Sequence, residues 1–244
     1  NEVDQFNRLN LFLNQLSEIW SEDLNLLVFL IDGQLVIGAV PETLFTIENS
    51  ELQSMALAGT KSIDQADDLL HNKKELAEHL LVADEIEKRL SDYNGLVRGE
   101  PYIWRSSQLA HLRSDFRMEL KGVDIDKRPR LVAELIRRLH PTPALGVLPW
   151  NQNSRTEYLQ MREEMRVSPF YGSPWILQLP SKLICLVAIR YLSILSNEVF
   201  VDVGAGVVKE SQFEKELKEI ELKLKRTVGF VTGVDVELAR GGKN

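Results

Sequence analysis

The order of the strand-like and helix-like segments constrains the fold of this chain more than any single motif does. Apolar and β-branched runs predict strands over residues 26–31, 34–39, 43–47, 52–57, 175–179, 183–191 and 198–203. Helical spacing of apolar residues predicts helices over residues 4–17, 66–90, 107–120, 128–139, 155–166 and 211–227. Strands therefore lie toward both ends of the chain, and most of the helices lie between them. This order favours an α+β fold in which the sheet is built from both ends of the chain.

The composition is that of an ordinary globular protein. The chain has 244 residues, of which 44% are hydrophobic and 27% are charged. These values allow a sizeable core and argue against a disordered or collagen-like chain. The sequence contains no linker rich in glycine, serine or proline and no internal repeat. We therefore expect residues 1–244 to form a single domain.

The charge balance argues against nucleic acid as a partner. Lysine and arginine number 29 against 36 aspartates and glutamates, which gives a net charge of -7 and repels a polyanion. The longest apolar run, residues 24–31, is far shorter than the ~20 residues that a membrane-spanning helix needs, so we expect no membrane partner. The single cysteine, Cys185, cannot form an intramolecular disulfide. Such cysteine usage suits a reducing cytoplasm.

Gly204 and Gly206 form a short glycine-containing segment after the last predicted strand. Because glycine has no side chain, the backbone amides here could closely approach an anionic ligand. The third glycine of a dinucleotide-binding fingerprint is absent. A turn or bulge between strands is the more common explanation of such a pair. The residues leave both interpretations open.

Three glutamates on predicted helices are spaced in a way that could serve a metal ion. Glu216 and Glu219 are three residues apart on the last helix, and Lys223 follows one turn later on the same face. Glu78 lies in the long helix that precedes them. A solvated charged face is the more common outcome for such residues. If the two helices face each other, however, the carboxylates offer the hard oxygen ligands that Mg²⁺ prefers.

His111 and Arg190 are set apart by their apolar surroundings. His111 lies between Ala110 and Leu112, where burial in the core is the more common outcome and contact with a ligand is the alternative. Arg190 ends an apolar run that begins at Ile184. A guanidinium in such a position is costly unless it meets a carboxylate, which it can bind with two hydrogen bonds. This favours a functional role for Arg190 slightly over a structural one.

Several segments together resemble the motifs of the chorismate-binding enzymes. In chain order they are Gly38-Ala39-Val40-Pro41-Glu42, Ala56-Leu57-Ala58-Gly59-Thr60, Glu78-His79-Leu80, Leu139-His140-Pro141-Thr142-Pro143-Ala144, Phe170-Tyr171-Gly172, Val187-Ala188-Ile189-Arg190 and Gly204-Ala205-Gly206-Val207-Val208. They occur in the family's order, and Glu216, Glu219 and Lys223 complete its closing motif. The resemblance extends from residue 6 to residue 228. It implies the family's fold, a sandwich of two antiparallel β-sheets with helices outside.

The resemblance also implies a general acid and a metal ion. Glu42 would protonate the departing ring hydroxyl of chorismate, a role that a raised carboxyl pKa favours. Glu78 and Glu219, with Glu216 nearby, would hold a Mg²⁺ cofactor. The ion would in turn bind the ring carboxylate of the substrate.

The remaining implied roles concern the binding of chorismate. Tyr171 and Arg190 would hold its enolpyruvyl carboxylate, assisted by backbone amides near Gly204 and Gly206. Thr60 and His111 would line the ring site, and Lys223 would add a cation.

Within the family, the motifs are most similar to those of the isochorismate synthases of menaquinone or siderophore type. Ala58 stands where aminodeoxychorismate synthases carry a nucleophilic lysine, and the R-P-R-G segment of anthranilate synthases does not follow Thr60. The implied reaction adds water at ring C2 as the C4 hydroxyl leaves. A salicylate synthase or another chorismate-using synthase is the first alternative. A non-catalytic homologue that binds a ligand or a partner protein is the second.

One family feature has no counterpart in the sequence given. Isochorismate and salicylate synthases carry a lysine base on a strand upstream of the segment that matches residues 38–42, whereas the first lysine here is Lys61. We expect either that the sequence begins inside the family domain or that the protein lacks this base. Val147 also replaces a family glycine, and bulk at such a position can block a ligand. The sequence does not indicate an oligomeric state.

Overall fold

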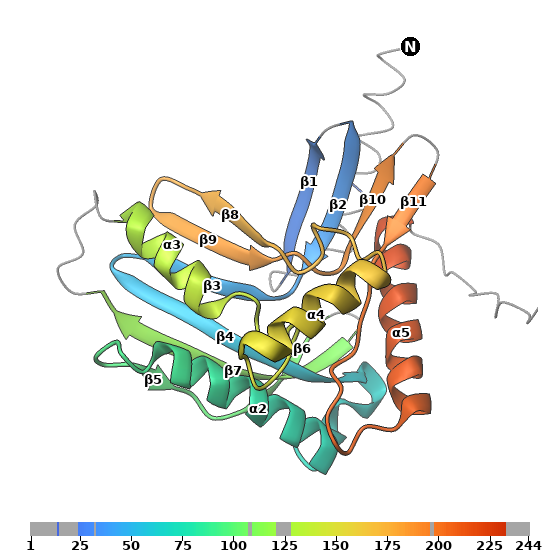
Figure 1. The fold of residues 1–244 in the computed structure, drawn as a ribbon, viewed down its shortest axis with the longest axis horizontal. Coiled ribbons are helices and arrows are strands. Elements are labelled where there is room, and N and C mark those ends of the chain that lie inside the picture. Colours follow the sequence, from blue (N-terminus) through green and yellow to red (C-terminus); the bar gives the residue numbers. More distant parts are fainter. Residues whose placement is uncertain are drawn as a thin grey trace, which may run out of the picture.

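Two antiparallel sheets with helices packed against them make up the structure (Figure 1). It is a computed structural model that describes Asn14 and residues 24–31, 33–106, 109–120, 128–195 and 198–232. Apart from Asn14, the helix predicted over residues 4–17 lies outside the described residues. Within the described ranges, no helix is both long and apolar enough to cross a membrane.

The smaller sheet combines strands from the two ends of the described chain. It consists of β1 (Asn25–Ile31), β2 (Gln34–Val40), β10 (Tyr191–Leu195) and β11 (Glu198–Val201), in the order β1-β2-β10-β11. Gly38 on β2 lies opposite Tyr191 on β10. A Cβ atom at Gly38 would lie 2.9 Å from the Cβ of Tyr191, so glycine permits the close approach of the two strands. The predicted contribution of both chain ends to one sheet is confirmed.

The larger sheet has seven strands. They are β3 (Thr43–Glu48), β4 (Glu51–Ser62), β5 (Val97–Arg98), β6 (Tyr102–Arg105), β7 (Leu109–Glu119), β8 (Pro174–Gln178) and β9 (Lys182–Val187). The order is β5-β7-β4-β3-β9-β8, and β6 pairs with β7. This sheet likewise joins early strands to late ones, because β3 pairs with β9.

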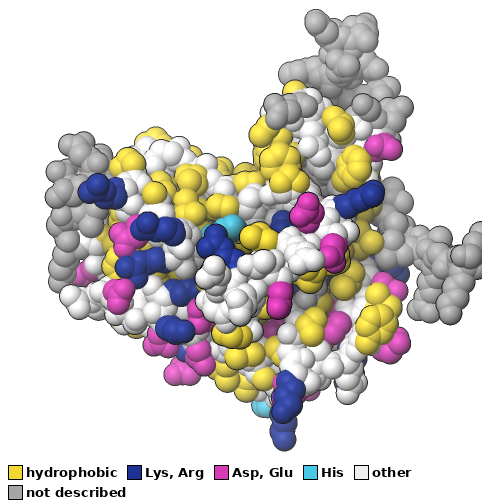
Figure 2. Space-filling view, in the orientation of Figure 1, with side chains coloured by type: hydrophobic (Ala, Val, Ile, Leu, Met, Phe, Trp, Pro, Cys, Tyr) yellow, Lys and Arg dark blue, Asp and Glu magenta, His cyan; other side chains and the backbone are white. Residues whose placement is uncertain are grey.

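The helices cover the sheets and contribute to the core, and on the face shown in Figure 2 acidic and basic side chains are interspersed with apolar ones. They are α2 (Lys73–Leu90), α3 (Arg128–Leu139), α4 (Gln152–Glu164) and α5 (Phe213–Thr232), with a 3-10 helix, η1, at Ile63–Asp68. Ala83 and Ile86 of α2 and Leu135 of α3 are buried with Phe45 and Phe116 of the larger sheet. The α5 helix contacts β2, β10 and β11 of the smaller sheet.

The long helix predicted over residues 66–90 begins later than expected. A 3-10 helix occupies residues 63–68, and α2 begins only at Lys73. The side chain of Asn72 accepts hydrogen bonds from the amides of Lys74 and Glu75, so it caps the first turn of α2. The predicted helices over residues 128–139 and 155–166 are confirmed as α3 and α4.

The helix predicted over residues 107–120 is wrong, because this segment forms strand β7. Leu112, Phe116 and Met118 are buried, whereas Arg117 and Glu119 alternate with them and are exposed. This period of two is that of a strand with one buried face. The short strands β5 and β6, which pair with β7, were not predicted either.

The strand predicted over residues 183–191 is interrupted where the chain passes from one sheet to the other. Strand β9 of the larger sheet ends at Val187, and β10 of the smaller sheet begins at Tyr191. Arg190, between them, has a φ of 54°, which is uncommon for a residue with a side chain. The chain makes the opposite crossing between β2 and β3, where Glu42 lies. The two crossings are side by side, since the amide of Val187 donates to the carbonyl of Glu42 (3.0 Å).

Candidate active site

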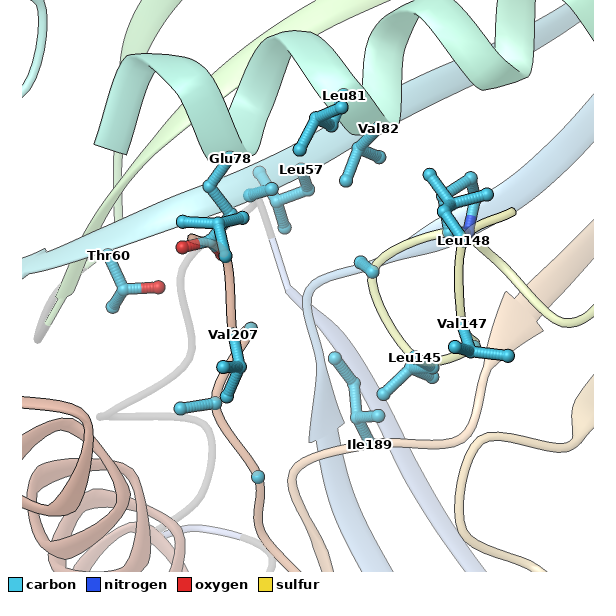
Figure 3. A pocket seen from close by; sticks show the side chains of 18 of the residues that line it. Leu57, Thr60, Glu78, Leu81, Val82, Leu145, Val147, Leu148, Ile189 and Val207 are labelled. Atoms are coloured by element: carbon cyan, nitrogen blue, oxygen red, sulfur yellow. The ribbon is translucent and has the colours of Figure 1, made fainter. Parts of the chain in front are cut away.

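A pocket of about 910 Å³ opens beside the two crossings (Figure 3). Its walls come from α2, β4, β7, the segment after α3, α4 and the segment between β11 and α5. The sequence-predicted residues that line it are Glu42, Thr60, Glu78, His111, Tyr171, Arg190, Gly204, Gly206 and Lys223. Glu216 and Glu219 do not line the pocket. They lie on α5 within ion-pair distance of Lys74 and Lys223, respectively.

Glu42 is the most buried acid of the pocket wall, with a relative exposure of 4%. Burial raises its pKa to about 7, although the Thr142 hydroxyl and the charges of Lys223 and Arg190 act in the opposite direction. A carboxyl with such a pKa is partly protonated near neutral pH. It can therefore donate a proton, and this is the property that acid catalysis requires.

Arg190 is held by His111. The guanidinium of Arg190 donates a hydrogen bond through Nη2 to Nε2 of His111. Since a guanidinium can only donate, Nε2 is the acceptor, and the proton of the neutral ring lies on Nδ1. Nδ1 is 3.0 Å from Oγ1 of Thr60. The Trp104 ring stacks on the imidazole with a centroid distance of 5.9 Å. His111 is thus both buried and part of the pocket wall, so its two interpretations are not exclusive.

Burial and the neighbouring positive charges keep the imidazole of His111 neutral. Burial, together with the charges of Arg190 and Lys223, holds the pKa of His111 well below its ordinary value. Burial also lowers the pKa of Arg190 to about 10, against the effect of Glu219 and Glu42. Arg190 therefore stays charged near neutral pH. The pocket presents one guanidinium whose position depends on a neutral histidine.

A bulge in β4 directs two backbone amides at the first turns of α2. The register with β7 shifts between Ala58 and Thr60, and Gly59 at the bulge has a φ of 75°. The amide of Gly59 donates to Oε1 of Glu78 (3.3 Å), and the amide of Thr60 donates to Oε2 of Glu75 (3.0 Å). A glycine is needed here because its φ is positive and because a Cβ would lie 3.0 Å from the carbonyl oxygen of Glu75.

The helices α2 and α5 do meet, and their carboxylates form an acidic cluster, which we define as Glu75, Glu78, Glu216 and Glu219. Lys74 links the first three: its Nζ is 2.8 Å from Glu78, 3.1 Å from Glu216 and 3.6 Å from Glu75. Burial raises the pKa of Glu78 and of Glu75, and in both cases Lys74 opposes the rise. The sequence left open whether the two helices face each other.

The acidic cluster fits a magnesium ion by the chemistry of its donors. Two buried oxygens, Oε1 of Glu216 and Oε1 of Glu219, make no hydrogen bond within the described residues, although a lysine lies near each. In the part of the chain that the structure describes, no three acidic, histidine or cysteine side chains converge on one metal position. Mg²⁺ needs only one or two carboxylates, because waters and ligand oxygens complete its shell.

The segment with Gly204 and Gly206 lies along the pocket wall and does not turn between strands. A Cβ at Gly206 would overlap the carboxylate of Glu78, and a Cβ at Gly204 would lie 3.3 Å from the Tyr171 hydroxyl. Lys223 donates to the carbonyl of Gly204 (2.9 Å) and pairs with Glu219 (2.7 Å). The more common explanation, a turn or bulge between strands, is therefore wrong here. The glycines allow the backbone to approach two predicted site residues.

Tyr171 is held in place from α4. Arg162 donates to the carbonyls of Tyr171 (2.8 Å) and Ser168 (3.1 Å). Burial raises the pKa of the Tyr171 hydroxyl, and the nearby acids Asp202 and Glu42 raise it further. The hydroxyl is therefore neutral and can donate a hydrogen bond into the pocket.

Sequence reasoning missed several supporting residues of the pocket. Thr142, whose hydroxyl lowers the pKa of Glu42, belongs to the family-like segment Leu139-His140-Pro141-Thr142-Pro143-Ala144, but the resemblance implied no role for it. Lys74 and Glu75 precede Glu78 by four and three residues, a spacing that places all of them on one face of α2. That spacing was a usable signal. Nothing in the sequence pattern pointed to Arg162.

A model of one protein family matches nearly the whole chain. The family is described as "Chorismate binding enzyme", and the match covers residues 3–231. The chain belongs to the chorismate-binding enzyme family. The predicted family resemblance is thereby confirmed.

Curated relatives of this chorismate-binding chain carry three different names. It is 28% identical over 206 residues to anthranilate synthase component 1 of Aquifex aeolicus (78% of this chain, 39% of the relative). It is 28% identical over 214 residues to isochorismate synthase MenF of Bacillus subtilis (83% and 43%). It is 29% identical over 221 residues to the salicylate biosynthesis isochorismate synthase of Pseudomonas aeruginosa (84% and 44%). The chain thus spans about two-fifths of the length of these relatives.

Solved structures with the same fold include isochorismate synthases. The 2,3-dihydroxybenzoate-specific isochorismate synthase DhbC from Bacillus anthracis has a TM-score of 0.74 at 27% identity, covering 91% of this chain and 61% of that chain. The menaquinone-specific isochorismate synthase MenF from Escherichia coli has a TM-score of 0.65 at 25% identity, covering 82% and 47%. The predicted fold class, two antiparallel sheets with helices outside, is confirmed.

Proposed function

We propose that this chorismate-binding protein converts chorismate to isochorismate with the aid of Mg²⁺. The observation that carries the proposal is the buried carboxyl of Glu42, whose pKa of about 7 suits an acid and which lines the same pocket as Arg190. The names of the relatives in Bacillus subtilis and Pseudomonas aeruginosa support the same reaction. Membership of the family supports chorismate as the substrate.

The cations of the pocket would bind the two carboxylates of the substrate. Arg190, already oriented by His111, would form paired hydrogen bonds with the enolpyruvyl carboxylate. The neutral hydroxyl of Tyr171 would donate to the same group, and the backbone amides near Gly204, which lies beside this hydroxyl, and near Gly206 would assist. Lys223 adds a positive charge at this end of the pocket. Chorismate is a dianion, so this placement of charge suits it.

Glu42 would supply the proton for the leaving group. In the proposed reaction the C4–oxygen bond breaks, the ring double bonds shift, and water forms a new bond to C2. Protonation by Glu42 lets the C4 hydroxyl leave as water. The attacking water gives up one proton to a base, so the overall reaction is an isomerisation. The family lysine proposed for that step has no match before Lys61 in the sequence given.

Magnesium would be held by Glu78 and Glu219, with Glu216 nearby. When bound, the ion supplies a positive charge for the ring carboxylate and for charge that develops as the leaving group departs. The chain's own contribution is to keep these carboxylates together, through the Gly59 amide on Glu78 and through the lysines of α2 and α5.

Product analysis together with calorimetry tests the proposal. The purified protein is incubated with chorismate and Mg²⁺, and the products are separated by chromatography. Isochorismate is the expected product, and its formation should stop when EDTA removes the metal. Salicylate with release of pyruvate would instead identify a salicylate synthase, the first alternative.

A binding protein without turnover is the second candidate, and one observation favours it. Val147 lines the pocket where the family resemblance expects a glycine, and a side chain at such a position can block a ligand. Calorimetry with chorismate and Mg²⁺ separates the two functions. Binding of chorismate without any product would support the non-catalytic homologue and overturn the proposed enzyme.

A further inference from the structure

Lys74 lies in the middle of the acidic cluster and bonds to carboxylates from two helices. Its Nζ donates to Oε2 of Glu78 on α2 (2.8 Å) and to Oε2 of Glu216 on α5 (3.3 Å). Glu78 and Glu216 are themselves buried, with relative exposures of 7% each. The lysine side chain is also largely covered, with 16% of its side-chain surface exposed. These contacts form a buried bridge between residues that are 142 positions apart in the sequence.

The position of Lys74 is unfavourable without these carboxylates. It lies in the first turn of α2, where the helix dipole favours negative side chains and disfavours a cation. Three carboxylates, those of Glu78, Glu216 and Glu75, lie within 3.6 Å of its Nζ and offset the cost of burying the ammonium group. The acidic cluster therefore holds the ammonium group in place.

Lys74 is also the only cation within ion-pair distance of these three carboxylates among the described residues. Lys223, the other lysine of the site, pairs with Glu219 and donates to the carbonyl of Gly204. Without Lys74, the negative charges of Glu75, Glu78 and Glu216 would face one another in a poorly solvated space. Unpaired carboxylates in this arrangement would bind an added cation more strongly than the same carboxylates bind it when they are paired with Lys74.

We propose that Lys74 is the built-in counter-ion of the acidic cluster and that a divalent cation must compete with its ammonium group for Glu78 and Glu216. This inference rests on the magnesium site of the proposed function. The lysine would keep α2 and α5 together at low Mg²⁺ concentration, and it would weaken the binding of Mg²⁺. The affinity of the protein for Mg²⁺ then depends on how much more strongly the carboxylates bind Mg²⁺ than they bind the Lys74 ammonium group.

The test compares Lys74→Met with Lys73→Met, a control variant at the neighbouring exposed lysine. Mg²⁺ binding is measured by calorimetry without chorismate, and Tm is measured in EDTA. We expect Lys74→Met to bind Mg²⁺ about tenfold or more tightly than wild type. We also expect its Tm in EDTA to fall by about 4 °C or more and to recover as Mg²⁺ is added. Lys73→Met should match wild type in both measurements.

A second variant covers the case in which Lys74→Met does not fold in EDTA. The double variant Lys74→Met with Glu216→Gln removes one positive and one negative charge together, so it should regain most of the lost Tm. Equal or weaker Mg²⁺ binding by Lys74→Met, or no Mg²⁺ binding by either protein, would overturn competition. A Tm in EDTA that the single variant does not lower would overturn the counter-ion role.

Turnover of chorismate, measured on the same preparations, keeps this inference apart from the proposed function. Tighter Mg²⁺ binding by Lys74→Met with no isochorismate formed by wild type would uphold the role of Lys74 and reject the proposed reaction. Isochorismate formation by wild type, with the Mg²⁺ affinity of Lys74→Met unchanged, would uphold the proposed reaction and reject the role of Lys74.

Discussion

Glu42 and Arg190 occupy the two points at which the chain passes between the sheets. Glu42 lies between β2 and β3, and Arg190 lies between β9 and β10. The crossings are tied to each other, since the amide of Ala39 donates to the carbonyl of Arg190 (3.1 Å) and that of Val187 to the carbonyl of Glu42 (3.0 Å). An acid and a cation are thus placed in one pocket by the same pair of backbone segments. A shift of either backbone segment would break hydrogen bonds to the other.

The pH dependence of the proposed reaction should follow Glu42. Because the acid acts in its protonated form and its pKa is about 7, we expect the rate to fall as pH rises above 7. The measurement is the pH profile of kcat. In Thr142→Val this fall in kcat should occur at higher pH, since the Thr142 hydroxyl lowers the pKa of Glu42. A profile that is flat above pH 7 in wild type would argue against Glu42 as the acid.

Stability should depend on the same carboxyl. The pKa of Glu42 is raised from 4.5 to about 7 by folding, so between these values the folded state binds more protons than the unfolded state. Stability therefore falls as pH rises through this window, by up to about 3 kcal/mol at higher pH. We expect Glu42→Gln to be more stable than wild type above pH 7. Urea unfolding at several pH values measures the difference. An equal change in Glu48→Gln, outside the pocket, would show that the effect is not specific.

Gly206 should be intolerant of a side chain. A Cβ there would overlap the Glu78 carboxylate, so Gly206→Ala should displace Glu78 and weaken Mg²⁺ binding roughly tenfold or more. Calorimetry with Mg²⁺ measures this effect. Gly99→Ala is the matched control, because a Cβ at Gly99 would meet only ordinary contacts with Asp115. Unchanged Mg²⁺ affinity in Gly206→Ala would show that the position of Glu78 beside Gly206 is not needed for Mg²⁺ binding.

The guanidinium of Arg190 should not be replaceable by an ammonium group. Arg190→Lys keeps the charge but loses the planar pair of donors and the bond to His111, so we expect KM for chorismate to rise roughly 10-fold or more. Far-ultraviolet circular dichroism and Tm check that the variant is folded. Arg155→Lys, on the exposed surface of α4, should leave KM unchanged. If the two variants have the same KM, Arg190 does not bind the substrate carboxylate.

Much of the fold follows from local patterns in the sequence, and the failures have physical causes. Strands β1 to β4 and helices α3 and α5 were predicted because each has a clear apolar period or uninterrupted apolar run. Strand β7 was missed although Arg117 and Glu119 alternate with buried residues, since its apolar residues at Leu109, Leu112 and Phe116 also fit helical spacing. The interruption at Arg190 could not be predicted from composition, because the residues on both sides remain apolar across the crossing.

Several residues of the candidate site stood out by their own sequence patterns, but their roles were predictable only through the family resemblance. The motifs supplied the residues, and nine of them line one pocket. The burial that raises the pKa of Glu42 arises where the chain crosses between the two sheets. It cannot be deduced from the residues next to Glu42 in the sequence. The bridge from Lys74 to Glu216 joins two helices that are distant in the sequence. Tertiary contacts of this kind leave no periodic signal in either helix.

The decisive experiment for the proposed reaction compares the rate of isochorismate formation by wild type and by Glu42→Gln at pH 7 with Mg²⁺. We expect isochorismate from wild type and a rate roughly 10²-fold or more lower in the variant, with chorismate binding retained. Equal rates in the two proteins would exclude Glu42 as the acid, and chorismate bound by wild type without isochorismate formed would exclude the reaction.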